Sequence, residues 1–371
     1  MTNQVLLTVS GIIPAGIEQR IANGERPRAD YLELARGLGA DLLDYNGART
    51  VAGATGRLIE RVGGPDLLLA WACFKLRHRY KAILTDGEQV GLPLAALLKF
   101  AGHGPRPRHL MIVHIISVPK KLVFLDRLGV HSHIDRFLTY STWQQQFIQR
   151  RWGLAAERVL FTPFMVDSRF FAPETVAPRP TPRPQICAVG LERRDYPTLL
   201  QAVEGLDAQV VIAAASPWSK RSDSTQGRQI PANVTVRKFS QYELRQLYAD
   251  SRFLVMPLEP VEFQAGVTAI LEAMAMGRAV LCSRTPGQTD VVIDGENGRY
   301  VPPGNPQALR AAIEQLLADP ATTARMGEQG RRMIEQGMSL DHYVERLRGF
   351  VEQAIADPNT DARPASILRR T

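Results

Sequence analysis

The chain has 371 residues, which is long for one hydrophobic core and enough for two α/β domains. Its 45% hydrophobic and 22% charged residues are typical of a soluble globular protein. Lys and Arg outnumber Asp and Glu by 45 to 37, and the excess lies entirely in residues 1–165, which hold 21 basic and 13 acidic side chains against 24 of each in the remainder.

The cysteines and the apolar runs exclude several classes of protein. Cys73, Cys187 and Cys282 are far apart and each lies in an apolar run, so the sequence has neither a disulfide framework nor a metal-binding spacing. No apolar run is long enough to span a bilayer, and the N-terminal residues lack the basic region of a signal peptide. We therefore expect a cytoplasmic protein, and the basic first half is compatible with peripheral binding at the inner membrane surface.

The first half begins as a doubly wound α/β domain. Residues 5–13 predict a strand, followed by a loop with several Gly and Pro residues and by a helix over residues 29–39 that ends at glycine. Strand, glycine-containing loop and helix form the opening unit of such a domain. Arg26 and Arg28 in the loop either contact an anionic ligand or are solvated.

Further strands are predicted over residues 40–45, 80–87 and 108–117. Asp86 stands at the C-terminal end of one of them, where ligands bind in open α/β sheets. Its carboxylate either belongs to a site or caps the following helix. His114 lies in the next strand and is either a core residue or a functional one.

A proline-rich stretch divides the chain into two domains. Residues 1–165 form the first domain, 166–184 a stiff linker and 185–337 the second domain. Residues 338–356 form a last amphipathic helix, and the polar tail 357–371 is predicted to be disordered.

The segment from Leu258 to Gly304 is the most informative part of the second domain. An apolar run leads through a polar loop with Gly266 into a segment, residues 268–276, that is rich in strong helix formers. A helix start leaves N–H groups unpaired and carries partial positive charge, so it binds anions such as a diphosphate. Glu272 lies one turn into this helix, where its carboxylate would accept ribose hydroxyls.

The motifs LEAMAMGRAVL, PGQTDVV, DGENGRYVPPGNP and IEQLLADP in this half resemble the C-terminal signature of family 4 glycosyltransferases. In that family a Glu, seven residues and a second Glu precede the Ala-Met-Ala-x-Gly helix end. Glu272 matches the second Glu, whereas Gln264 stands where the family has the first. The resemblance implies a GT-B fold: two Rossmann-like doubly wound domains that face each other across a cleft, with the last helix crossing back to the first domain.

The resemblance also implies roles for individual residues. Arg194 matches a family Lys that holds the donor diphosphate, Arg193 supplies a second charge, and Gln264 meets hydroxyls of the donor sugar. His114 matches a family histidine that points at this sugar. The remaining expected donor-binding residues are Gly11, Gly16, Ser216, Lys238, Ser240, Glu262, Ala265, Gly266, Val267, Thr268 and Glu272.

The function implied by the resemblance is transfer of a sugar from a nucleotide diphosphate sugar, with retention of anomeric configuration and without a metal or a cofactor. The basic first domain favours an anionic or membrane-presented acceptor. A catalytically silent sugar-nucleotide binder and a nucleotide-sugar epimerase on the same fold remain alternatives. A dinucleotide dehydrogenase is disfavoured because no strand precedes a Gly-x-Gly-x-x-Gly sequence, and nucleic acid because basic and aromatic residues do not interleave.

Overall fold

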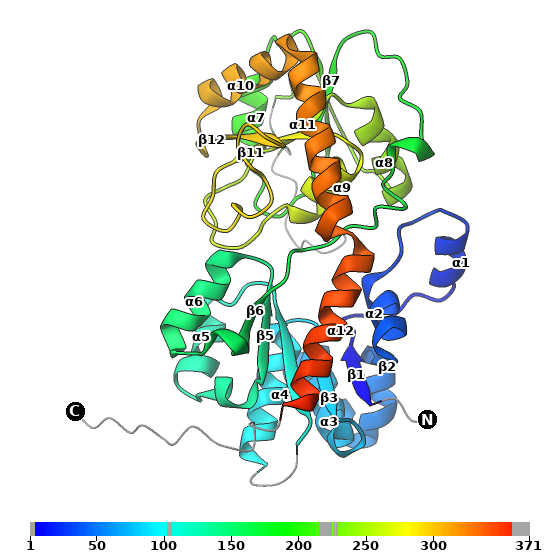
Figure 1. Ribbon diagram of the computed structural model, residues 1–371, viewed down its shortest axis with the longest axis vertical. Helices are drawn as coiled ribbons and strands as arrows, with labels where there is room; N and C mark the ends of the chain where they lie inside the picture. The colour runs from blue at the N-terminus through cyan, green and yellow to red at the C-terminus, as the bar shows by residue number, and fades with distance from the viewer. Residues whose placement is uncertain (1–3, 102–105, 215–224, 226, 228, 358–371) are drawn as a thin grey trace, which may run out of the picture.

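The computed structural model describes residues 4–101, 106–214, 225, 227 and 229–357. It contains two six-stranded parallel sheets, one in each half of the chain (Figure 1). The first sheet has the order β2-β1-β3-β4-β5-β6. Its strands are β1 (Val5–Thr8), β2 (Ala40–Leu43), β3 (Ala82–Thr85), β4 (Arg108–Val113), β5 (Arg136–Thr139) and β6 (Val159–Phe161).

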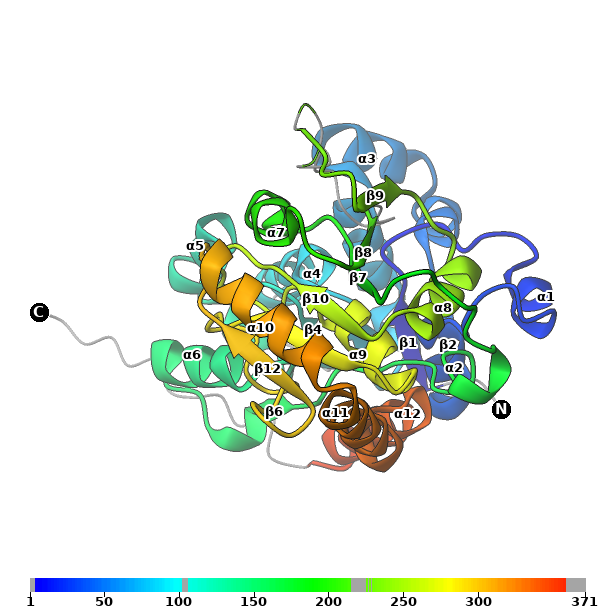
Figure 2. The same cartoon turned by 90° about the horizontal axis from the view of Figure 1, so that it is seen from above.

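Helices cover both faces of the first sheet because its strands are apolar on both sides. One face is covered by α2 (Asp30–Leu38) and α12 (Leu340–Ala356). The other is covered by α3 (Tyr45–Leu76), α4 (Glu88–Phe100), α5 (Pro119–Asp126) and α6 (Thr142–Trp152). Short 3₁₀ helices η1 (Arg77–Arg79), η2 (Val130–His133) and η3 (Ala156–Arg158) complete this half, and the short α1 (Ile17–Ala22) lies at its periphery (Figure 2).

The second sheet has the order β12-β11-β10-β7-β8-β9. Its strands are β7 (Gln185–Val189), β8 (Gln209–Ala213), β9 (Val234–Arg237), β10 (Phe253–Met256), β11 (Ala279–Ser283) and β12 (Gly298–Val301). The helices α7 (Tyr196–Val203) and α10 (Pro306–Ala318) pack on one face, and α8 (Gln241–Asp250) and α9 (Val267–Ala275) pack on the other. The helix α11 (Pro320–Met333) contacts α9 and β11.

The chain returns to the first domain through a π-helical turn, Ile334–Met338, which joins α11 to α12 (Figure 1). There Val166 pairs with Ser339: the N–H of Val166 donates to Met338 O, and the N–H of Leu340 donates to Val166 O. The two chain segments that connect the domains are therefore hydrogen-bonded to each other.

The first part of the proline-rich linker is packed rather than open. Phe170 and Phe171 are buried in the core of the second domain, and Ala172 is buried directly before the short η4 (Pro173–Thr175). Arg28 is not a solvated loop arginine, because its guanidinium binds the carboxylates of Asp167 and Asp341. Arg28 thus ties the first loop to both connecting segments.

The sequence predicts reduced, buried cysteines and no segment that spans a membrane. Cys73, Cys187 and Cys282 are free and buried, and burial raises the pKa of each thiol to about 12. Among the described residues, no helix combines the length and the hydropathy that crossing a bilayer requires. The tail beyond Asp357 lies outside the described residues, and Asp357 itself forms an ion pair with Arg136.

Candidate functional site

The N-terminus of α9 lacks a side chain at Gly266, so other groups can lie close to the backbone there. Gly266 precedes the helix with φ 80°, a left-handed conformation that favours glycine. A methyl group added there would lie 2.6 Å from the sulfur of Met256 and 3.3 Å from Cζ of Arg194. Gly266 therefore brings the guanidinium of Arg194 beside the unpaired N–H groups of the helix start.

Arg194 is held in this place by the end of β7. Its Nε donates to Val189 O at 2.8 Å and its Nη1 donates to Glu192 O at 2.6 Å, while its side chain crowds Gly190. Burial lowers the pKa of this guanidinium, which is buried at 6% exposure. A rigid, desolvated cation beside a helix N-terminus is suited to bind a diphosphate.

Arg193 has the same side chain but a different environment. It is the one non-glycine residue of the described chain with positive φ, 58°, and its Nη1 binds Glu259 at 3.2 Å. Glu192 lies 3.9 Å from its Nε. Two carboxylates therefore lie close to the guanidinium of Arg193, whereas Nε and Nη1 of Arg194 donate to backbone carbonyls.

Glu272 lies one turn into α9 and is buried, with 6% exposure. Its Oε2 accepts a hydrogen bond from the hydroxyl of Tyr248 at 2.7 Å. Burial raises the pKa of this carboxyl from 4.5 to about 7, although the Tyr248 hydroxyl lowers it. The carboxyl is thus poised between its neutral and ionised forms near neutral pH.

The loop before α9 contains the remaining predicted residues of this stretch. Gln264 and Ala265 are buried, Glu262 and Thr268 are exposed, and Val267 packs into the core as the first residue of the helix. The structure thus separates Gln264, which turns inward, from Glu262 two residues earlier.

Other predicted donor-binding residues lie farther along the sheets. Lys238 and Ser240 follow the edge strand β9; Lys238 is exposed, and Ser240 caps α8 in a capping box with Glu243. The backbone N–H of Ser240 donates to Glu243 and so is not free for a base. Ser216 lies outside the described residues.

The two glycines predicted in the first loop are placed differently. Gly11 follows β1 at the C-terminal edge of the first sheet, and its carbonyl accepts the N–H of Tyr45. Gly16 is exposed and, with φ 70°, begins α1, which both views place at the periphery (Figures 1 and 2). Gly16 is therefore part of a peripheral loop.

His114 follows β4 and is paired with Asp86. Its Nε2 lies 3.1 Å from Oδ1 of Asp86, and its ring packs against Tyr140. Burial lowers the pKa of His114, but the hydrogen bond and the charge of Asp86 outweigh it and raise the pKa above the ordinary value. Asp86 does not cap α4, whose N-cap is Gly87 without a side-chain bond; the capping alternative is wrong, because the carboxylate turns toward His114.

Two further acidic residues support this histidine, and sequence reasoning missed both of their roles. Glu88 is buried and accepts the N–H of Ile115 at 2.6 Å, which fixes the backbone directly after His114. Asp30 begins α2; burial, followed by the charge of Asp86, raises its pKa to about 6. The position directly after a predicted strand was the available signal for Glu88, but no signal marked Asp30.

The two domains meet where the C-terminal ends of their sheets lie. Thr142, at the start of α6, donates its backbone N–H and its hydroxyl to Asp290 of the loop after β11, at 3.0 and 2.6 Å. Gln144, in the same turn, donates to His114 O at 2.9 Å. Ser141 caps the helix, because its side chain accepts the N–H of Gln144. The interdomain contact and His114 are thus joined through one helix turn.

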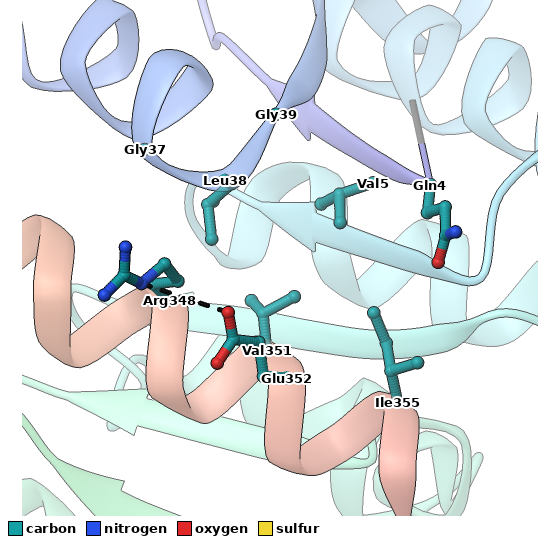
Figure 3. A pocket seen from close by; sticks show the side chains of 9 residues that line it. All are labelled: Gln4, Val5, Gly37, Leu38, Gly39, Arg348, Val351, Glu352 and Ile355. Carbon is teal, nitrogen blue, oxygen red and sulfur yellow. Dashed lines mark ion pairs between the residues drawn. The ribbon is translucent and has the colours of Figure 1, made fainter. Parts of the chain in front are cut away.

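Two surface hollows lie away from this region. One, of about 290 Å³, lies between α12, the start of β1 and the end of α2, and includes Gln4, Gly39, Arg348 and Glu352 (Figure 3). Because it opens at the N-terminal ends of the strands, it is not part of the site. The other, of about 400 Å³, is lined by apolar side chains of α3, α4 and α5.

Comparisons with known proteins identify the second domain. Residues 184–319 match the family model of glycosyl transferases group 1. The chain is 27% identical over 198 residues to alpha-D-kanosaminyltransferase of Streptomyces kanamyceticus, a match that covers 49% of this chain and 50% of that protein. The chain therefore spans about half the length of this curated relative.

Solved structures extend the similarity to the whole fold. The sucrose-phosphate synthase of Thermosynechococcus elongatus superposes with a TM-score of 0.70 at 19% identity, covering 95% of this chain and 99% of that one. Anabaena HepE, solved with UDP and glucose, gives 0.63 at 16% identity and covers 94% and 99%. The expected pair of Rossmann-like domains is confirmed as a GT-B fold. The resemblance to family 4 glycosyltransferases is confirmed by the match of residues 184–319 to the glycosyl transferases group 1 family model.

Proposed function

We propose that this chain transfers a sugar from a nucleotide diphosphate sugar to an acceptor, with retention of the anomeric configuration. The observation that carries the proposal is the convergence of Arg194 and the N-terminus of α9 at Gly266. In glycosyl transfer, negative charge develops on the leaving diphosphate, and a fixed cation beside a helix N-terminus stabilises charge at that place. The nucleotide found in HepE, whose fold this chain shares, supports a nucleoside diphosphate donor.

The proposed reaction uses the chain's own groups in distinct roles. Arg194 and the backbone of residues 265–268 hold the diphosphate, and Glu272 accepts the ribose hydroxyls. His114 is held by Asp86 and faces the donor sugar from the first domain. This arrangement supplies the positive charge at the leaving group from protein groups, which is why we propose metal-independent transfer without a cofactor. Retention rests on the family 4 resemblance.

A thermal-shift panel of UDP, GDP, ADP and TDP with their sugars tests the proposal. A ligand that binds only the folded state raises its stability, so at least one nucleotide and its sugar derivative should raise the unfolding temperature. Arg194→Met should abolish that shift, and the exposed Gln201→Leu on α7 serves as the control. If no nucleotide shifts the transition, the donor site is wrong.

Donor hydrolysis separates transfer from the two alternatives. A glycosyltransferase releases nucleoside diphosphate slowly from its donor in the absence of acceptor. A silent sugar-nucleotide binder releases none, and an epimerase returns an isomerised donor that still carries its nucleotide. Chromatography of the nucleotide products therefore distinguishes all three.

The acceptor is proposed to be anionic and presented at a membrane. The first domain exposes Leu58 and Val62 on α3, Phe100 at the end of α4 and Val123 on α5, and Phe100 also lines the apolar hollow between these helices. Exposed basic side chains accompany them on α3 and α5: Arg57, Arg61, Lys120 and Arg127. Apolar side chains among exposed arginines and lysines fit the interface of an anionic bilayer.

We predict that the protein sediments with vesicles of phosphatidylcholine and phosphatidylglycerol but not with vesicles of phosphatidylcholine alone. Replacing Leu58 and Val62 by Asp should release it, because two apolar side chains can no longer insert into the bilayer and two negative charges are added. Tyr242→Asp changes another exposed side chain, on α8 in the second domain, and should leave binding intact. Equal recovery of the protein in the supernatant with both kinds of vesicle would contradict the membrane proposal.

A further inference from the structure

Two loops at the C-terminal edge of the second sheet lie directly against each other. They are the loop before α9, residues 257–266, and the loop after β11, residues 284–297. The N–H of Gly287 points to Val261 O, and a methyl group added to Gly287 would lie 2.4 Å from the carbonyl of Phe263. The φ angle of Gly287 is not positive, so its backbone conformation does not require glycine. Glycine is required at this position only because a side chain would clash with Phe263. The contact brings Gln264 and Gln288, the next residue in each loop, to neighbouring backbone positions.

The side chains at this contact are buried and lack hydrogen-bond partners. Gln288 has 0% exposure, Thr285 1% and Gln264 8%. Both amide atoms of each glutamine and the hydroxyl of Thr285 have no partner. They are five of the nine such buried atoms in the described part of the chain, so the unpaired groups are concentrated at one place rather than scattered.

Unpaired groups of this kind indicate a polar ligand. Nearly all buried polar atoms of folded proteins are hydrogen-bonded, because desolvation without a partner costs free energy. Gln264 lies two residues before Gly266, beside which the guanidinium of Arg194 is fixed. The amide cluster therefore adjoins the proposed diphosphate site, on the side from which the chain enters α9.

The chemistry of the cluster defines the class of ligand. An amide offers two donors and an acceptor, and a hydroxyl offers both, whereas a carboxylate only accepts. The three side chains carry no net charge, so they match hydroxyl or amido substituents better than a carboxylate or a phosphate group.

We propose that Thr285 and Gln288 join Gln264, for which the family resemblance already implies a contact with the sugar, in a neutral hydrogen-bonding wall that recognises the uncharged sugar of the donor and sets its specificity. This inference rests on the proposed function, because the sugar is placed by the diphosphate. Gln288 and Thr285 are assigned here to sugar recognition from their unpaired burial, not from the sequence pattern.

The test separates binding of the nucleotide from binding of the sugar. Calorimetric affinities for the preferred nucleoside diphosphate and for its sugar derivative are compared in the wild type, Gln288→Leu and Thr285→Val. Both variants should keep the affinity for the diphosphate within about twofold and lose at least tenfold in affinity for the sugar nucleotide. Because each substitution removes unpaired buried atoms at similar volume, the unfolding temperature without ligand should be equal to or above that of the wild type.

Each other outcome has a defined meaning. If Gln288→Leu binds the sugar nucleotide as the wild type does, the wall does not contact the sugar and the inference is wrong, while the proposed function stands. A lower unfolding temperature in both variants with unchanged affinity would show that the amides bond to water or to each other for structural reasons. If the wild type binds no nucleoside diphosphate, the proposed function fails and this inference fails with it. Comparing hydroxyl-bearing with N-acetylated sugars then identifies which substituent the amides bind.

Discussion

Glutamine in place of Glu272 should make the protein more stable at pH 8 and weaken its binding of nucleotide. The carboxyl has a pKa of about 7 in the folded state against 4.5 in its ordinary environment, because it is buried. Between these values the folded state holds a proton that the unfolded state releases, so this group makes stability fall as pH rises from about 4.5 to 7. Above pH 7 the loss is on the order of 3 kcal/mol.

The Glu272→Gln variant removes this loss and keeps the contact to Tyr248, because its amide oxygen still accepts the tyrosine hydroxyl. Urea unfolding at pH 5 and pH 8 should give a gain in stability that is larger at pH 8. Affinity for the nucleoside diphosphate should fall roughly tenfold at pH 8, since a hydrogen bond to a charged group is lost. Glu328→Gln, at an exposed position of α11, should change neither quantity. A variant whose stability follows that of the wild type across this pH range would show that Glu272 does not titrate there.

Methionine in place of Arg194 should lower donor turnover about 10²- to 10³-fold, corresponding to about 3–4 kcal/mol of lost stabilisation of the leaving diphosphate. The reason is that this guanidinium is held rigidly by two backbone carbonyls beside the α9 N-terminus. The same substitution at Arg193 should cost less than about tenfold, because Glu259 already compensates its charge. Donor hydrolysis rates of the two variants measure the difference.

Folding must be separated from chemistry in this comparison. Removing Arg194 also deprives the carbonyls of Val189 and Glu192 of a donor, so thermal unfolding of each variant is measured alongside. Arg194→Lys keeps the positive charge but loses the planar guanidinium group, which can bind two phosphate oxygens at once. Its turnover should lie between those of the wild type and Arg194→Met. A larger loss at Arg193 than at Arg194 would reverse the assignment of the two residues.

The sequence alone predicts those parts of the structure that depend on residues close together in the chain, such as strands, helices and helix starts. The alternation of apolar strands and helices predicts both sheets, and the glycine at 266 correctly marks the start of a helix. The anion-binding character of the α9 N-terminus follows from the same local information.

The sequence was insufficient wherever a side chain chooses between partners that are distant in the chain. Asp86 has the position of a helix cap, yet it binds His114, 28 residues away. Arg193 and Arg194 are chemically identical neighbours, and only the left-handed backbone at Arg193 and the carboxylate of Glu259 distinguish them. The unpaired amide of Gln288 depends on two loops meeting at Gly287, which no local pattern reports.

The pairing of the two connecting segments limits how the domains can move. A single connection would allow twisting as well as bending, but here the backbones at Val166 and Ser339 are bridged and Arg28 clamps both segments. Two connections that are bonded to each other resist relative twisting of the domains, so we expect the domains to move by bending at these connections. A bend large enough to separate the domains would break the hydrogen bonds of Thr142 to Asp290. The bridge between Val166 and Ser339 is therefore the expected hinge between the domains, and the contact between Thr142 and Asp290 is the one that would hold the domains closed.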